Sequence, residues 1–265
     1  IVSIKSILIE RADAKVLDLV NTDFVFVKAD LDQEDVASLI SQYNLTNIPV
    51  VDDSMKLLGR ITVDDIIDVM EEESTEDILK ISGVSEDEEL SGTWLAAVKS
   101  RLPWLVINLG TAYLAASIIR HFDSTVHDIP IIAAYMTIIA GMGGNAATQA
   151  LAVTVRRIAM TDLTDNQAYN TVVKEFLVGM INGAANGLIV FAIALVYDAS
   201  LKLGIVLFLA MTGNLIVAGL TGSSIPLVLK RVGIDPAVAS SIIITTFTDC
   251  AGFLLPLWFA TKLLQ

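Results

Sequence analysis

The sequence predicts a mainly α-helical membrane protein, in which a domain of five membrane-spanning helices follows a smaller α/β segment and an acidic connecting helix. Hydrophobic residues make up 54% of the 265 residues, more than a soluble domain of this size normally contains. Charge is divided unevenly, because residues 1–100 hold 22 acidic and 8 basic residues and residues 101–265 hold 8 and 9. Five long apolar stretches lie in that second, nearly neutral part.

The α/β segment covers residues 11–72, where strand and helix signals alternate. The extended FVFVKAD is followed by DQEDVASLISQYN, whose apolar residues fit one helical face. NIPVVDD then predicts a buried strand and a turn, and LLGRIT leads into the helix VDDIIDVMEEE. Val2–Leu8 repeats the apolar pattern of Ile61–Ile67, so residues 1–10 are predicted to be the tail of a preceding repeat.

NIPVVDDSMKLLGRITVDDIIDVM resembles the second motif of a CBS domain pair, and GRITVDDII is the most characteristic part. The resemblance implies a cytosolic regulatory module of a kind that often dimerises and often binds adenosine nucleotides, which leaves ATP binding open here. The chain begins at Ile1 without a methionine or a signal peptide. We therefore expect it to be part of a longer protein.

The predicted connector covers residues 73–101 and is strongly acidic at its start. A charge run of this kind is by default a solvated linker. It could also form a helix with Trp94 at the membrane interface, and we predict the helix. Clustered carboxylates repel one another, and a divalent cation would relieve that repulsion.

The membrane domain is predicted over residues 102–265. Its apolar stretches are long enough to cross about 30 Å of hydrocarbon, and they predict helices over about 102–121, 129–157, 174–198, 202–229 and 236–262. Basic residues gather in two of the links between them: Arg156, Arg157, Lys174, Lys230 and Arg231. By the positive-inside rule these links are cytoplasmic, so the acidic part lies inside and the C-terminus outside.

Asp249 is the one charged residue between Pro236 and Thr261. A charged carboxylate at membrane depth costs about 2.5–3.5 kcal/mol and should face a cavity or a partner. Ser241, Thr245 and Asp249 recur at intervals of four and form one helical stripe. Since no span holds a deeply placed Lys or Arg, the missing countercharge could be a permeating cation. A protonated Asp249 that hydrogen-bonds a neighbouring helix, or relays protons, remains the alternative.

Small and amide residues are frequent in three spans, as in GMGGNAATQ, INGAANG and MTGNLIVAG. Small residues let helices approach closely and amides hydrogen-bond between them, which explains most of these glycines. A polar conduit is the second interpretation. It is favoured more for Asn145 than for Asn182, Asn186 and Asn214.

Several classes of protein are disfavoured by composition. One cysteine and two histidines rule out a disulfide framework and a Cys/His zinc site, so any cation site must use oxygen ligands. GMGGN lacks the lysine of a phosphate-binding loop, and no nucleophile constellation indicates an enzyme. We expect no nucleic-acid partner.

The order of a CBS-like segment, an acidic connector and five spans, with GMGGNAATQ in the second and TTFTDCAGF in the fifth, resembles the MgtE family of magnesium channels. The resemblance implies a homodimer in the inner (plasma) membrane, with a pore on the two-fold axis lined by the second and fifth spans. It also implies an acidic domain before the CBS pair. The family's pore aspartate falls on Asp249, and its second-span motif falls on Gly144, Asn145, Thr148 and Gln149.

The predicted function is therefore a Mg²⁺ channel that is gated by Mg²⁺ sensing. The expected ion-binding residues are Asp249, Thr245, Ser241, Asn145 and Thr148. The expected sensing acids are Asp64, Asp65, Asp68, Glu71, Glu72, Glu73, Glu86, Asp87, Glu88 and Glu89. A proton-coupled divalent-cation transporter is the main alternative; a CBS-regulated chloride channel and a membrane scaffold explain Asp249 less well.

Overall fold

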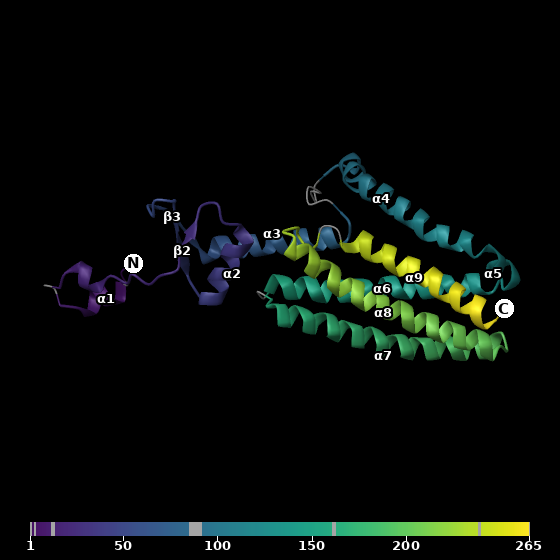
Figure 1. The fold of residues 1–265 in the computed structure, drawn as a ribbon. Helices are drawn as coiled ribbons and strands as arrows, with labels where there is room; N and C mark the ends of the chain where they lie inside the picture. The colour runs from purple at the N-terminus through teal and green to yellow at the C-terminus, as the bar shows by residue number, and fades with distance from the viewer. Residues whose placement is uncertain are drawn as a thin grey trace. The chain divides into compact units, whose positions relative to one another are not determined.

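The computed structural model describes residues 2, 4–11, 14–84, 92–160, 163–237 and 240–264. The chain divides into two compact units, Ile1–Thr75 and Glu76–Gln265. The fold is mainly helical, with a small mixed sheet in the first unit and five long apolar helices in the second (Figure 1). Each unit is described by itself.

The first unit is built around a three-stranded sheet in the order β1, β2, β3. β1 (Val27–Lys28) pairs in parallel with β2 (Asn47–Val51), and β2 pairs antiparallel with β3 (Leu57–Thr62). The parallel pair requires a crossover connection, which α2 (Gln33–Tyr43) supplies. Two short elements precede the sheet, α1 (Ile4–Ile9) and the 3₁₀ turn η1 (Val16–Leu19).

Local signals explain where α2 begins and ends. The Asp32 carboxylate accepts a hydrogen bond from the Glu34 amide at 3.0 Å, a standard N-cap. Asn44 ends the helix in the left-handed region with φ of 49°, which asparagine tolerates. The helix buries Val36, Ala37 and Ile40 against Ile48 of β2. α3 (Val63–Ile81) then follows β3 directly.

The second unit contains the end of α3, a short helix α5 (Asp123–Asp128) and five helices long and apolar enough to cross a membrane. The long helices are α4 (Trp94–His121), α6 (Ile132–Met160), α7 (Asp165–Tyr197), α8 (Leu201–Arg231) and α9 (Ser240–Leu263). Polar residues set their starts. Thr93 caps α4 through the Ala96 amide and Ser200 caps α8 through the Leu203 amide, while the Gln167 side chain accepts from the Thr164 amide at the start of α7.

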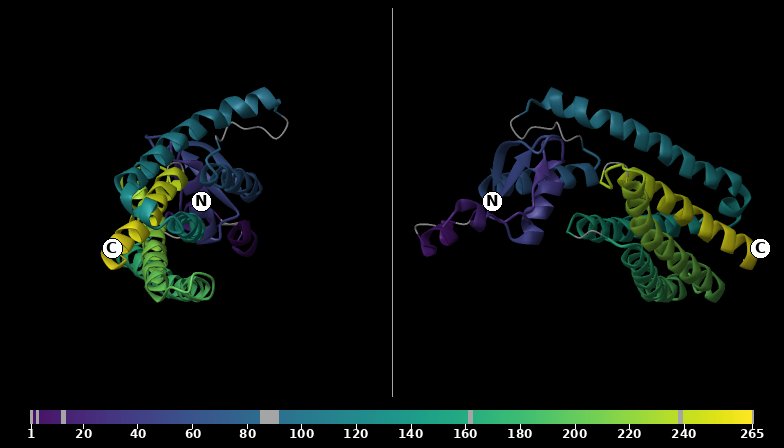
Figure 2. Two further views of the ribbon diagram at one scale, coloured as in Figure 1. Left: turned by 90° about the vertical axis from the view of Figure 1, so that its right-hand side faces the viewer. Right: turned by 60° about the vertical axis from the view of Figure 1, so that its left-hand side comes forward.

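α8 is the central helix of the second unit and packs against α6, α7 and α9. Its buried residues Leu207, Met211 and Leu215 form the main core with Ile139 of α6 and Val190 of α7. α4 packs beside α9 and leaves most of its own surface exposed. Figure 2 shows α4 diverging from the other four long helices toward its N-terminal end.

α3 continues past the boundary of the predicted α/β segment and ends at Ile81, while α4 begins at Trp94. Both helices therefore enter the range 73–101 that was predicted as the connector. Residues 85–91 lie outside the described residues. The extent of the connector stays a prediction.

Candidate ion pathway

Asp249 lies near the middle of α9, where its side chain is half-buried. Ser241 and Thr245 share its helical stripe and are also half-buried. The Thr245 hydroxyl donates to the Ser241 carbonyl at 2.9 Å, so its oxygen keeps lone pairs that can accept from water. The neighbouring stripe of Ile244 and Thr248 is buried. The polar stripe therefore runs along the margin of the contact that α9 makes within the chain.

Contacts between α9 and α6 fix the level of Asp249 along the bundle. Leu257 packs in one cluster with Ile132 and Met136, and Ile244 packs in another with Ala147 and Leu151. The two helices are therefore antiparallel. A Cβ at Gly252 would lie 2.7 Å from the Ala140 Cα, so the two backbones come close together there. One turn back from Gly252, Asp249 comes level with the Gly143–Gly144 turn of α6.

One face of α6 stays exposed although the opposite face is buried. Gly141, Asn145, Thr148 and Gln149 all lie exposed, with Gly144 half-buried beside them. The Thr148 hydroxyl donates to the Gly144 carbonyl at 2.9 Å. The GMGGNAATQ segment thus presents amide and hydroxyl groups outward at the level of Asp249.

Asp249 makes no ion pair with any Lys or Arg in the parts of the chain that the structure describes. Those parts also contain no group of three or more His, Cys, Asp or Glu side chains able to hold a metal ion. One chain thus offers a single carboxylate, with neutral oxygen groups on its own helical stripe and at the same level of α6. Such a set suits a hydrated divalent ion better than a dehydrated one, because Mg²⁺ releases its waters reluctantly.

The expected sensing acids fall into three groups. Asp64, Asp65, Asp68, Glu71 and Glu72 are exposed on α3. Glu73 is half-buried, and its carboxylate accepts a hydrogen bond from the Gln33 side-chain amide at 2.7 Å. Glu86, Asp87, Glu88 and Glu89 lie outside the described residues.

Asp65 already has a local role. Its carboxylate accepts from the Thr62 hydroxyl at 2.6 Å and from the Thr62 amide at 3.2 Å. The hydroxyl hydrogen bond, followed by the amide hydrogen bond, holds the pKa of Asp65 below its usual value. Asp65 therefore stabilises the start of α3 whether or not an ion binds it.

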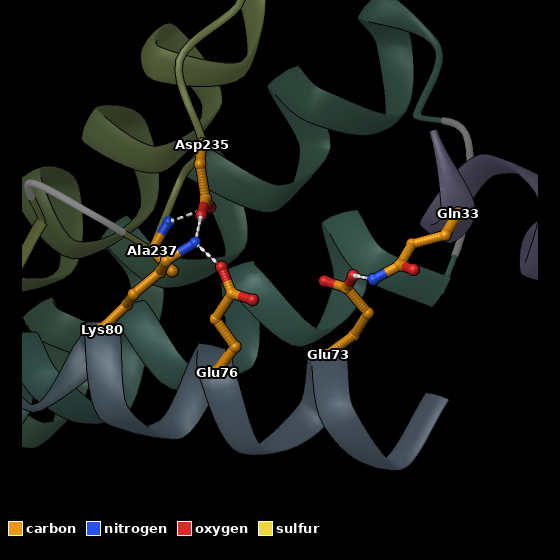
Figure 3. Close-up of polar contacts among 6 residues, drawn as sticks. All are labelled: Gln33, Glu73, Glu76, Lys80, Asp235 and Ala237. Atoms are coloured by element: carbon orange, nitrogen blue, oxygen red, sulfur yellow. Dashed lines mark hydrogen bonds and ion pairs between the residues drawn. The ribbon is translucent and has the colours of Figure 1, made fainter. Parts of the chain in front are cut away.

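The end of α3 contacts the loop that precedes α9, within the second unit (Figure 3). Lys80 forms an ion pair with Glu76 on its own helix and a second pair, at 2.8 Å, with Asp235 in the loop between α8 and α9. Asp235 also accepts from the Ala237 amide at 2.8 Å. Ile81 packs against the cluster that contains Ala147 and Ile244. This contact lies just before Ser241, the first residue of the polar stripe.

Comparison with known proteins identifies two related families. Residues 136–259 match the MgtE family, described as a divalent cation transporter, and residues 16–72 match the CBS domain. The stretch from α6 to α9 is therefore similar to MgtE transporters. A magnesium transporter MgtE of Enterococcus faecalis is 39% identical over 96% of this chain and 56% of its own length. Those of Bacillus subtilis and Thermus thermophilus are each 31% identical over 100% of this chain and 59% of their own length.

The chain thus spans less than two thirds of the length of these MgtE relatives. The MgtE match runs from Met136 in α6 to Phe259 in α9, so it contains all the expected ion-binding residues and excludes α4. The CBS resemblance and the multi-pass membrane character are confirmed. MgtE is a transporter family and not an enzyme family.

Two features of the site escaped the sequence analysis. The Lys80–Asp235 pair joins residues that are far apart in the chain, and no periodic pattern connects them. Asn214 was grouped with asparagines that could face a conduit, yet it is fully buried between α8 and α6. The tight MTGN sequence around it was the available signal, because small residues beside an amide favour a polar contact between helices.

Proposed function

We propose that the chain forms the ion-conducting part of a homodimeric Mg²⁺ channel of the plasma membrane, with a pore lined by α6 and α9. Asp249 is the ion-recognising carboxylate in this proposal. The observation that carries it is a half-buried acid in an apolar helix, level with the outward-facing amide and hydroxyl groups of α6.

Charge supports a dimer. Each chain brings one carboxylate to this level, whereas two chains across a two-fold axis would bring two. A divalent ion would gain about twice the Coulomb energy of a monovalent ion at equal distance. Ser241, Thr245, Asn145 and Thr148 would bind the water shell, so that the ion passes largely hydrated.

The basic links support the orientation. Arg157 ends α6, and Lys230 and Arg231 end α8 at the same side of the bundle. The positive-inside rule makes that side cytoplasmic. The CBS portion is then cytoplasmic and the C-terminal end of α9 is outside.

Regulation is proposed to act through the end of α3. High cytosolic Mg²⁺ would bind the exposed acids of α3 and the connector, relieve their repulsion and keep Lys80 in contact with Asp235 beside the start of α9. Low Mg²⁺ would weaken this contact and open the pore. The ion needs only to bind the closed state more tightly than the open state.

The test is Mg²⁺ flux into proteoliposomes that contain Asp249→Asn or Asp249→Ala. Charged hydrogen-bonding groups are worth roughly 1.5–3 kcal/mol each, and two copies would be lost per pore, so flux should fall at least about 100-fold. Glu175→Gln is the matched control, because Glu175 is an acid in α7 that is 6% exposed and whose backbone packs against Gly219 of α8.

Normal flux in both Asp249 variants, with folding and assembly intact, would refute the pore assignment. Flux that moves protons in fixed ratio to Mg²⁺ and vanishes in Asp249→Asn would instead support the proton-coupled transporter.

A further inference from the structure

Asn214 of α8 carries a buried amide that directly contacts α6. The side chain is 0% exposed, and its Nδ2 donates to the Ile139 carbonyl at 2.7 Å. Its Oδ1 is buried without a hydrogen-bond partner in the described part of the chain. A buried acceptor left unpaired is destabilising. If position 214 served only to pack the helices, a leucine there would be more stabilising than an asparagine.

The amide reaches α6 at Gly143, where a larger residue would have to displace it. A Cβ at Gly143 would lie 2.2 Å from the Asn214 Nδ2, far inside van der Waals contact. The Ile139 carbonyl is the helical acceptor for the Gly143 amide, so Asn214 holds that same turn. This turn is weak by itself, because Gly141, Gly143 and Gly144 each disfavour a helix relative to alanine.

The opposite side of the same turn carries Asn145. Two residues along an α-helix are about 200° apart around its axis, so Gly143 faces α8 while Asn145 points away from it and is exposed. Any rotation of this turn would move Asn145 relative to Asp249. Asn214 contacts this turn from the side of α8 and therefore opposes such a rotation.

We propose that Asn214 is a positioning residue of the ion pathway, whose amide fixes the Gly143 turn of α6 and thereby aims Asn145 at the passing ion. This role rests on the proposed function. It requires no contact between Asn214 and the ion.

The first test measures Mg²⁺ flux against Mg²⁺ concentration for Asn214→Leu and Asn214→Ala in the full chain. Both variants remove the amide, and the alanine variant cannot clash if leucine fails to fold. We expect both variants to raise the KM for Mg²⁺ flux about tenfold and to leave the maximal rate nearly unchanged. For Asn214→Leu we also expect the thermal midpoint of unfolding to stay the same or to rise. Asn186→Leu is the control, since its Nδ2 donates within α7 to the Asn182 carbonyl at 2.9 Å. An unchanged KM with a lowered maximal rate and thermal midpoint would mean a purely structural role and overturn the proposal.

A second test needs no transport. In a Cys250→Ala background, which removes the single cysteine, Asn145→Cys is labelled with a water-soluble methanethiosulfonate reagent. Adding Asn214→Leu should change the labelling rate at least about threefold, whereas Asn186→Leu should leave it unchanged. Equal rates would overturn the positioning role. Absence of Mg²⁺ flux in the unmodified chain would refute the proposed function instead, and leave the labelling result to decide the positioning role.

Discussion

The α7–α8 pair and the α6–α9 pair are packed in different ways, although both lie in the same apolar bundle. α7 meets α8 at Gly179, Gly183 and Gly187, where an added Cβ would lie 2.4–2.9 Å from the nearest atoms of α8. α6 meets α9 at one such glycine, Gly252, and leaves polar side chains half-buried or exposed along the margin. The first pair is joined through its backbones at three glycines, whereas the second is joined at one and presents polar groups beside it.

This difference separates support from function within one domain. Backbones that touch cannot slide without large strain, because packed interiors leave no free volume. The α7–α8 pair therefore acts as a rigid support, and Asn214 of α8 transmits that rigidity to α6. The α6–α9 pair can expose oxygen groups because these groups take no part in the packing between the two helices.

The largest expected effect breaks the support. Gly219→Val would place a Cβ 2.3 Å from the Glu175 carbonyl oxygen, a clash with backbone that no rotamer relieves. Overpacking typically costs about 1–3 kcal/mol and occasionally more, so we expect loss of a monodisperse peak in size-exclusion chromatography and a lower thermal midpoint. Gly110→Ala is the control, because nothing lies within 4 Å of its added Cβ. Equal behaviour of the two variants would show that the close contact is not needed for folding.

The next effect distinguishes the exposed amides of the two pairs. Asn145→Leu removes an outward amide of α6 level with Asp249, while Asn182→Leu removes an exposed amide of α7. Each lost hydrogen bond to the ion's water shell is worth roughly 0.7 kcal/mol, and two copies are lost per pore. Mg²⁺ flux should therefore fall about tenfold in Asn145→Leu and stay unchanged in Asn182→Leu. A similar loss in both would mean that the amides serve helix packing.

The sequence predicted these elements unequally, for physical reasons. Hydropathy located all five long helices, because crossing a bilayer requires an apolar length that few other structures need. It placed their starts less well: α4 begins at Trp94 and α7 at Asp165, since the capping residues Thr93 and Thr164 are polar and lie outside any apolar window. Helical spacing put Ser241, Thr245 and Asp249 on one stripe, and all three are half-buried.

Periodicity could not identify contacts between helices. It shows which residues share a face, but it does not show which helix covers that face. Asn214 and Gly143 are therefore paired only in the folded chain, as are Lys80 and Asp235. Both pairs lie beside the polar groups of α6 and α9. The sequence therefore indicated these polar groups but not the contacts between helices that hold them in place.

The smallest expected effect concerns the end of the α6–α9 pair that α3 contacts. Lys80 and Asp235 have side chains that are 16% and 37% exposed, whereas Lys28 and Asp53, also 2.8 Å apart, are 54% and 94% exposed. Partly exposed ion pairs contribute at most about 1 kcal/mol, so Lys80→Ala should raise Mg²⁺ flux under high cytosolic-side Mg²⁺ about fivefold at most. In the proposed gating, bound Mg²⁺ also protects the connector against protease, and Lys80→Ala should weaken that protection. Lys28→Ala should change neither quantity, because its pair lies in the first unit and is well solvated. A lower flux in Lys80→Ala would reverse the proposed direction of gating, because the Lys80–Asp235 ion pair would then favour the open pore. Helices α6 and α9 would in that case need the contact with α3 in order to conduct.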